Sequence, residues 1–159
     1  MTTRADIRRY ALVFAVAPLF AGCSLWRGDS SANEVEREAV SVESKAKESH
    51  TLSSLARMEE SLAAYVKAEK RIPEKLDDLV PKYLAEIPTA ETGLSAHGDT
   101  QRVRVYPSST LRDGHVDGTR LKDTGGWGYV YNDRQVVVFV DCTHKASSGR
   151  AWYLERGSF

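Results

Sequence analysis

The chain has 159 residues, 42% of them hydrophobic, and its 22 basic side chains balance its 22 acidic ones, so the formal net charge is zero. This length allows one modest domain with extensions. A balanced charge gives no electrostatic basis for binding nucleic acid or strongly acidic substrates, and no nucleic-acid partner is expected.

The first 22 residues have the layout of an export signal. Arg4, Arg8 and Arg9 open the segment, an apolar run follows at 10–20, and two small residues precede Cys23. About a dozen apolar residues span roughly 18 Å as a helix, which is too short for the roughly 30 Å hydrocarbon core of a bilayer. Residues 1–22 are therefore predicted to be a cleaved signal peptide rather than a stable membrane span.

The end of this segment, Leu19-Phe20-Ala21-Gly22-Cys23, resembles the lipobox of bacterial lipoproteins. Phe20 departs from that pattern, because the family usually has Leu three places before the cysteine. The resemblance implies cleavage before Cys23, attachment of lipid (palmitate included) to Cys23, and a periplasm-facing membrane tether. Ser24 stands where an Asp commonly retains such lipoproteins in the inner membrane, which favours the outer membrane. The alternative is an ordinary signal peptide that leaves Cys23 as a free thiol.

Residues 23–50 are polar and charged, with acidic and basic side chains mixed between Glu34 and Glu48. This composition predicts a lipid-anchored linker, partly helical, in which a flexible tether grades into a solvated helix. A folded domain is predicted over 51–159. If Cys23 carries lipid, Cys142 has no cysteine partner, so the domain must be stabilised by its packed core rather than by a disulfide.

An amphipathic helix is predicted over 50–70. Its apolar residues recur at steps of three and four, at Leu52, Leu55, Met58, Leu62, Tyr65 and Val66, which indicates one buried stripe. Pro73 prevents the helix from continuing and is expected to begin a second, short helix.

The second half of the domain has the features of a small sheet. An alternating strand is predicted at 101–106, with Val103 and Val105 on one face, and further strands are predicted at 127–131, 135–142 and 151–154. Asn132-Asp133 suits a tight hairpin turn with positive φ angles. The apolar run 136–140 predicts a central strand covered on both faces. The fold class is α+β, a long N-terminal helix packed on a small antiparallel sheet. The expected structural core includes Leu62, Tyr65, Pro73, Pro88, Trp127 and Val138.

This order of elements resembles the globular part of a type II secretion pseudopilin of the major, G-like kind, or more broadly a type IV pilin-like domain. The resemblance depends on Leu62-x-x-Tyr65, Ile72-Pro73, Leu76, Leu79, Pro81, Tyr83-Leu84, Ile87-Pro88 and Gly125-Gly126-Trp127-Gly128-Tyr129. It implies the pilin-like fold and an association with a type II secretion or type IV pilus system.

The chain also departs from this family. Lys70 stands where the family often has Gly, and Ile72 stands where it has an aromatic residue. A pilin continues its long helix into an apolar N-terminal half, whereas this chain has the charged segment 23–50 there. The protein is therefore not expected to be a fibre subunit, since burying unpaired Glu or Lys side chains in a fibre core would cost several kcal/mol each.

Asp141-Cys142-Thr143-His144 is the one nucleophile-like group of residues in the sequence. In an extended strand, Cys142 and His144 point to the same face, about 6.6 Å apart. They could form a dyad in a small periplasmic enzyme or redox protein. The favoured interpretation is a buried structural cysteine that continues the core face of the strand.

Metal binding is not predicted. Asp113, Asp117 and Asp123 could supply oxygen ligands to calcium, but the spacing and the terminal Glu of an EF-hand loop are missing, and Asp-Gly turns explain the loop. The four histidines, His50, His97, His115 and His144, lack paired metal-ligand spacing, so neither a zinc site nor a cofactor is expected.

These observations favour a non-enzymatic envelope lipoprotein that presents a pilin-like domain for contacts with a protein partner. The alternative is the small periplasmic enzyme or redox protein that uses Cys142 and His144.

Overall fold

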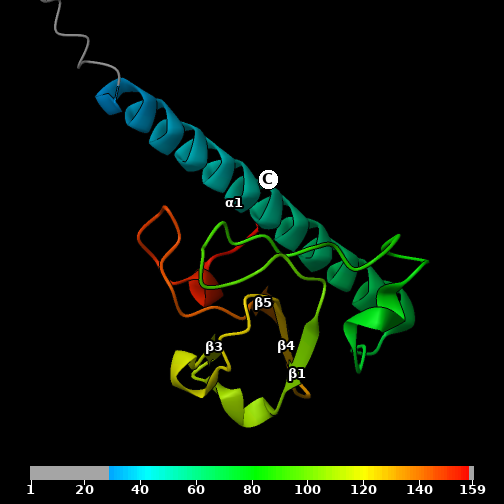
Figure 1. The fold of residues 1–159 in the computed structure, drawn as a ribbon. Helices are drawn as coiled ribbons and strands as arrows, with labels where there is room; N and C mark the ends of the chain where they lie inside the picture. The colour runs from blue at the N-terminus through cyan, green and yellow to red at the C-terminus, as the bar shows by residue number, and fades with distance from the viewer. Residues whose placement is uncertain (1–28, 158–159) are drawn as a thin grey trace, which may run out of the picture.

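Helix α1 runs without a break from Asp29 to Glu69 and lies against one face of a small sheet (Figure 1). The computed structural model describes residues 29–157, with side chains from Asn33 onward. The predicted helix over 50–70 is thus the second half of a longer one. From Asp29 onward, the segment expected to grade from a flexible tether into a helix is helical throughout. The signal peptide and Cys23 lie outside the described residues.

The helix ends where the chain takes a left-handed backbone conformation. Lys70 has a φ of 56°, and its N–H donates a 3.0 Å hydrogen bond to the carbonyl of Val66. Glycine is the residue that usually takes this conformation after a helix, because it has no Cβ to clash. The chain then reaches Pro73, and the short helix expected there begins only at Leu76, as the 3-10 helix η1 (Leu76–Leu79).

The main sheet has three strands in the order β1-β4-β5. β4 (Trp127–Tyr131) pairs antiparallel with β5 (Val136–Val140) and parallel with β1 (Val103–Tyr106). The sheet is therefore mixed, and the expectation of a purely antiparallel sheet is wrong. The connection 107–126 is long enough to bring the chain back to the end of the sheet at which β1 begins. β4 can therefore run in the same direction as β1. It contains the hairpin of β2 (Leu111–Arg112) and β3 (His115–Val116), with the 3-10 helices η2 (Ser108–Thr110) and η3 (Gly118–Arg120).

Two further strand predictions are corrected. β4 is the central strand and β5 is an edge strand. The prediction for β5 is wrong because a continuous apolar run indicates that both faces of a strand are covered, but it does not indicate how many neighbouring strands pair with it. The segment expected as a strand at 151–154 forms the 3-10 helix η4 (Trp152–Leu154), and only a single bridge joins Ala151 to Lys145.

The alternation in β1 and the turn after β4 also differ from the prediction. Val105 is 51% exposed, whereas Tyr106 is buried on the face assigned to the arginines. Neither Asn132 nor Asp133 has a positive φ. Instead, Asn132 Oδ1 accepts hydrogen bonds from the N–H groups of Arg134 and Gln135, at 2.8 and 2.9 Å, which closes a wider turn.

The core is divided by the sheet into two clusters. The larger lies between α1 and the sheet and joins the helix residues Leu55, Met58, Leu62 and Tyr65 to sheet and loop residues that include Trp127, Tyr129, Val138, Val140 and Cys142. The smaller lies on the opposite face, where Val130 and Phe139 pack with Tyr106 and Val116. The loop connection 107–126 therefore covers the face that the helix leaves free.

Candidate functional site

Four side chains with metal-binding atoms meet at one end of the sheet, although they come from three separate segments. His97 lies in the loop between Ala90 and Thr100, Asp123 lies just before β4, and Cys142 and His144 follow β5. One donor atom from each of the four lies within 4.8 Å of the other three. We call these residues the four-donor cluster.

A buried carboxylate holds the Asp123 segment against the end of β5. Asp141 is 0% exposed, and its Oδ1 accepts a 2.8 Å hydrogen bond from the hydroxyl of Tyr106. Its Oδ2 accepts a 2.6 Å hydrogen bond from the hydroxyl of Thr124. Asp123 itself is oriented by the N–H of Thr143, which donates to Asp123 Oδ1 at 2.7 Å. These hydrogen bonds fix the segment that carries Asp123 relative to the segment that carries Cys142 and His144.

The distances inside the cluster centre on one nitrogen of His144. His144 Nδ1 lies 3.3 Å from His97 Nε2, 3.6 Å from Cys142 Sγ and 3.5 Å from Asp123 Oδ2. His97 Nε2 lies 3.4 Å from Asp123 Oδ1. The two imidazole rings are nearly perpendicular, at 79°.

The cluster is buried on one side and open on the other. Cys142 is 0% exposed and the His97 side chain 8%, whereas the side chains of Asp123 and His144 are 31% and 47% exposed. Burial raises the pKa of the Cys142 thiol to about 12, and Asp123 adds to this effect. Burial acts to raise the pKa of Asp123 too, but the Thr143 N–H and the two imidazoles outweigh it and lower that pKa below its ordinary value.

The same geometry does not form a nucleophilic triad. In such a triad, the base contacts the nucleophile through one ring nitrogen and the orienting carboxylate through the other. Here Cys142 Sγ and Asp123 Oδ2 both face Nδ1 of His144. One nitrogen cannot take the thiol proton and also hold the carboxylate, so the arrangement fits shared ligation of an ion better than proton transfer.

The sequence anticipated only part of this cluster. It paired Cys142 with His144 but expected no metal site, because the spacing rules for zinc compare ligands that are close in the chain. His97 and Asp123 are distant in sequence and are joined to the pair by the tertiary fold. The one local signal was the alternation of Cys142 and His144, which puts two donors on one side of an extended segment.

The three acidic residues considered for calcium do not form one site. Asp123 belongs to the four-donor cluster. Asp117 caps η3, where its Oδ1 accepts hydrogen bonds from the N–H and hydroxyl of Thr119, and Thr119 lowers its pKa. Asp113 is an exposed turn residue between β2 and β3 with a φ of 51°. Among the described residues, the one group of His, Cys, Asp and Glu arranged to hold an ion is the four-donor cluster.

The six residues expected in the core take two kinds of position. Leu62, Tyr65, Trp127 and Val138 are buried in the larger core cluster. Pro73 is buried and Pro88 is half-buried, and their carbonyl oxygens accept hydrogen bonds from Tyr129 Oη at 2.6 Å and from Trp127 Nε1 at 2.7 Å. Both prolines therefore anchor the chain that wraps back over the aromatic residues of β4.

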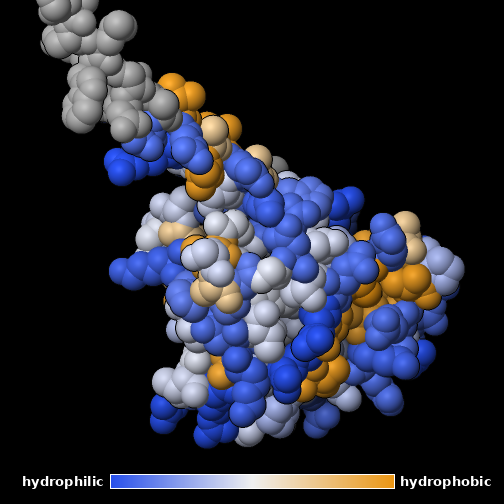
Figure 2. Space-filling model, viewed as in Figure 1, coloured by the Kyte–Doolittle hydropathy of each residue, from blue (hydrophilic) through white to orange (hydrophobic). Residues whose placement is uncertain are grey.

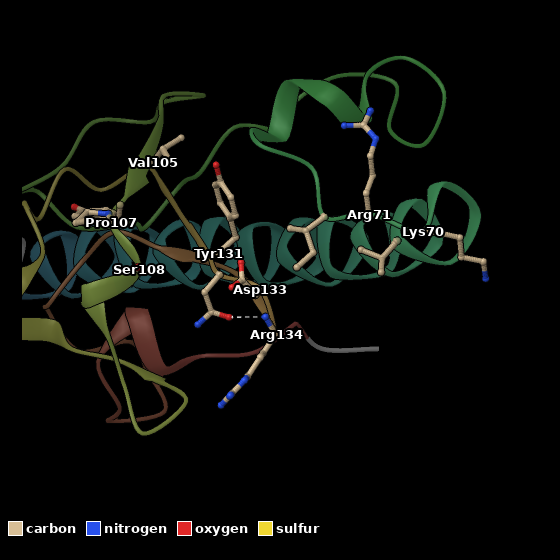
Figure 3. A pocket seen from close by; sticks show the side chains of 12 residues that line it. Lys70, Arg71, Val105, Pro107, Ser108, Tyr131, Asp133 and Arg134 are labelled. Atoms are coloured by element: carbon tan, nitrogen blue, oxygen red, sulfur yellow. Dashed lines mark hydrogen bonds between the residues drawn. The ribbon is translucent and has the colours of Figure 1, made fainter.

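A second feature is an open hollow of about 1160 Å³ between the end of α1 and the β4–β5 turn. Its lining includes the basic side chains of Lys70, Arg71 and Arg134, but no Cys or His. Figure 3 shows these three basic side chains pointing in different directions rather than converging on one point. The three basic side chains therefore do not form a common binding point in the hollow.

Comparison with models of known protein families, with curated proteins and with solved structures finds no match for this chain. The resemblance to pseudopilins therefore stays a prediction from the sequence. Within residues 29–157, no helix is long and apolar enough to cross a membrane.

Proposed function

We propose that the protein is a non-enzymatic envelope lipoprotein, anchored through lipid on Cys23, that holds a pilin-like domain away from the membrane for contact with a protein partner. The observation that carries this proposal is the solvent exposure of the first part of α1. Every side chain from 33 to 43 is exposed, and packing against the domain begins at Ser44. Residues 29–43 thus form a stalk about 22 Å long, visible as the blue end of the helix in Figure 1.

The position of the stalk fits a lipid anchor. Residues 24–28 separate Cys23 from the start of α1. A segment of that length can span at most about 20 Å, so a lipid on Cys23 keeps the stalk close to the membrane surface and the domain beyond it. Outer-membrane attachment, which Ser24 favours, is part of the same proposal.

The surface of the stalk argues against burial in a fibre. It is mainly hydrophilic in Figure 2, with isolated apolar patches, and Val35, Val40 and Val42 are 66%, 62% and 64% exposed. The charged residues beside or between these valines are Glu34, Glu36, Arg37, Glu38 and Glu43. Packing such a helix into a fibre axis would bury unpaired charges. An association with a type II secretion or pilus system would therefore be that of an accessory protein.

The enzyme alternative has less support. It requires the Cys142 thiol to reach a substrate, but the Cys142 side chain is fully buried. It also requires His144 to contact the thiol and an orienting group through different ring nitrogens, and the two contacts share one nitrogen.

The anchor can be tested with Cys23→Ser in the full chain. We expect loss of palmitate labelling and either an unprocessed precursor or release from the membrane fraction, with the domain still folded. Cys142→Ser, which removes the other thiol, is the matched control and should keep the lipid. Membrane association with unchanged lipid labelling in Cys23→Ser would refute the lipoprotein proposal.

The non-fibre role needs a separate experiment. Electron microscopy of the full chain under conditions in which pseudopilins assemble should show no filaments. Filaments that enclose the segment Glu34 to Glu48 in their core would restore the role of a fibre subunit.

A further inference from the structure

The donor atoms of the four-donor cluster lie close together, but the distances between them are longer than those of strong hydrogen bonds. Good N–H···O bonds have donor–acceptor distances of about 2.7–3.2 Å. The contacts of His97 Nε2 and His144 Nδ1 with each other and with Asp123 range from 3.3 to 3.5 Å. Several polar atoms therefore surround a common centre, and these contacts are longer than those of good hydrogen bonds.

These distances match those between ligands around one tetrahedral zinc ion. With zinc–nitrogen bonds of about 2.05 Å, two nitrogen ligands lie about 3.3 Å apart, and nitrogen and oxygen ligands about 3.4 Å apart. With a zinc–sulfur bond of about 2.3 Å, nitrogen and sulfur lie about 3.6 Å apart. The corresponding separations here are 3.3 Å between the imidazole nitrogens and 3.6 Å from His144 Nδ1 to the thiol. The carboxylate approaches each imidazole with a different oxygen: His97 Nε2 lies 3.4 Å from Asp123 Oδ1, and His144 Nδ1 lies 3.5 Å from Asp123 Oδ2.

We propose that a zinc ion binds between His97, Asp123, Cys142 and His144 as a structural ion whose four positions are all filled by protein. All four donor atoms lie within 4.8 Å of one another, and a pair near that limit must approach by about an ångström to complete the tetrahedron. The inference is independent of the lipid anchor, because the cluster lies wholly within the folded domain.

The donor set selects the kind of metal. A thiolate ligand excludes calcium and magnesium as the preferred ions, since these take oxygen ligands. Two imidazoles, a thiolate and a carboxylate in a tetrahedral arrangement suit zinc, whereas copper(II) and nickel(II) favour square-planar geometry. A thiolate and a carboxylate also neutralise the two charges of the ion, so the partly buried site carries no net charge.

The surroundings orient the ligands as metal sites require. The N–H of Thr143 holds Asp123 Oδ1, which is the outer hydrogen bond that ligating carboxylates usually have. The ring of His97 packs on Gly125, where an added Cβ would lie 2.5 Å from His97 Cβ and 2.6 Å from Cγ. Gly125 has a φ of 74°. A side chain at Gly125 would displace the His97 ring, so this glycine leaves the space that the ring occupies.

The ion would join two loops that hold the same stretch of α1. The loop with His97 contacts the helix through Glu91, Gly93 and Asp99, which bond to Thr51, Ser44 and Lys47. The loop with His144 contacts it through Ser147, which bonds to Glu48. Zinc would therefore fix the middle of the helix, residues 44–51, at the point where the stalk leaves the domain.

The test uses the full chain, purified in detergent and equilibrated with zinc alone. Elemental analysis should find about one zinc per chain, and the same count is expected for Cys23→Ser and for His115→Ala, an exposed histidine outside the cluster. Cys142→Ser and His144→Ala should bind zinc at least about 100-fold more weakly. His144→Ala is included because the His144 side chain is 47% exposed. Its removal should disturb folding less than a change at the fully buried Cys142. Wild-type protein that retains no zinc, or cluster variants that bind as tightly as His115→Ala, would overturn the proposal.

Cobalt(II) in place of zinc tests the coordination. We expect intense visible absorption typical of a tetrahedral ion, together with a thiolate-to-cobalt band that disappears in Cys142→Ser. Weak absorption typical of six-coordinate cobalt would refute the closed four-ligand site. Hydrogen exchange then tests the consequence: chelation of zinc should reduce protection at 44–51 but not at 55–65. Unchanged exchange at 44–51 after complete removal of zinc would disprove the proposed link to the helix.

Discussion

Thr51 of the helix exchanges two hydrogen bonds with the backbone of Glu91. Its hydroxyl donates to the Glu91 carbonyl at 2.8 Å and accepts from the Glu91 N–H at 2.7 Å. Thr51 is fully buried, so its hydroxyl is shielded from water and satisfies both backbone polar groups of Glu91. The pair is one of three hydrogen-bonded links between the middle of α1 and the loop that carries His97.

Replacing Thr51 with Val keeps the shape of the side chain and removes both hydrogen bonds. We expect Thr51→Val to lower the free energy of unfolding by about 1–3 kcal/mol, because two backbone groups lose their partner. Ser53→Ala is the control, since Ser53 is exposed and bonds only to its own helix. Urea denaturation of both variants provides the measurement. A loss below half a kcal/mol for Thr51→Val would contradict the role given to this pair.

Leu62→Ala tests the packing of the helix on the sheet. Leu62 is 4% exposed and lies in the same cluster as Val138. Removing its side chain should cost about 2–5 kcal/mol of stability, as large-to-small changes do in a packed core. Val42→Ala, on the exposed part of the same helix, should stay within about 0.5 kcal/mol of wild type. Equal effects of the two variants in thermal or urea unfolding would show that the helix is wrongly placed.

Gly128→Ala tests the contact between β4 and β5. Gly128 pairs with Phe139, and an added Cβ would collide with the Phe139 ring. Such overpacking should destabilise the domain by about 1–3 kcal/mol. Phe139→Leu should relieve part of the clash, so the double variant is expected to be more stable than the sum of the two single effects. Strict additivity in urea unfolding would mean that the ring does not cover the glycine.

Lys70→Gly should stabilise the protein. Lys70 has a φ of 56° at the end of α1, which strains a residue with a Cβ and suits glycine. A gain of about 0.5–1 kcal/mol in the free energy of unfolding is expected. Lys67→Gly, inside the last helical turn, is the matched control and should lose about 1 kcal/mol. A loss of stability in Lys70→Gly would show that the lysine side chain has a role beyond backbone geometry.

Tyr106 should make stability depend on pH in the alkaline range. Burial raises the pKa of Tyr106 from 10.0 to about 12, and its hydrogen bond to Asp141 adds to this effect. Because the folded state favours the protonated phenol, its contribution is complete below pH 10 and is lost as the pH rises towards 12. Within this window the loss should be about 1 kcal/mol per pH unit.

Tyr106→Phe should be less stable than wild type at pH 8, because Asp141 loses a hydrogen-bond donor. It should also have a shallower decline between pH 10 and 12, measured by urea unfolding at fixed ionic strength. Identical slopes for the two proteins would mean that the phenol ionises equally in the folded and unfolded states.

Much of the fold was predictable because its signals are local. The stripe through Leu55, Met58 and Leu62 repeats at helical spacing, and the β4 and β5 segments are apolar at strand length. Pro73 marks the end of a helix because its ring restricts the backbone. Asn132 marks a turn because its side-chain oxygen accepts hydrogen bonds from nearby backbone N–H groups. The α+β class and the helix-facing residues of the larger core therefore follow from the order of residues alone.

Other features depend on residues that only the fold brings together. Whether β1 runs parallel or antiparallel to β4 is decided by how the connection 107–126 crosses the sheet, and strand composition does not encode that direction. The four-donor cluster joins His97 to Cys142 and Asp123 across three segments, so no spacing rule applied to one segment could find it. The sequence by itself determined which faces are apolar, since burial of apolar area follows from periodicity. The tertiary structure decided the strand order and the cluster, because loop paths and long-range contacts set which distant polar groups meet.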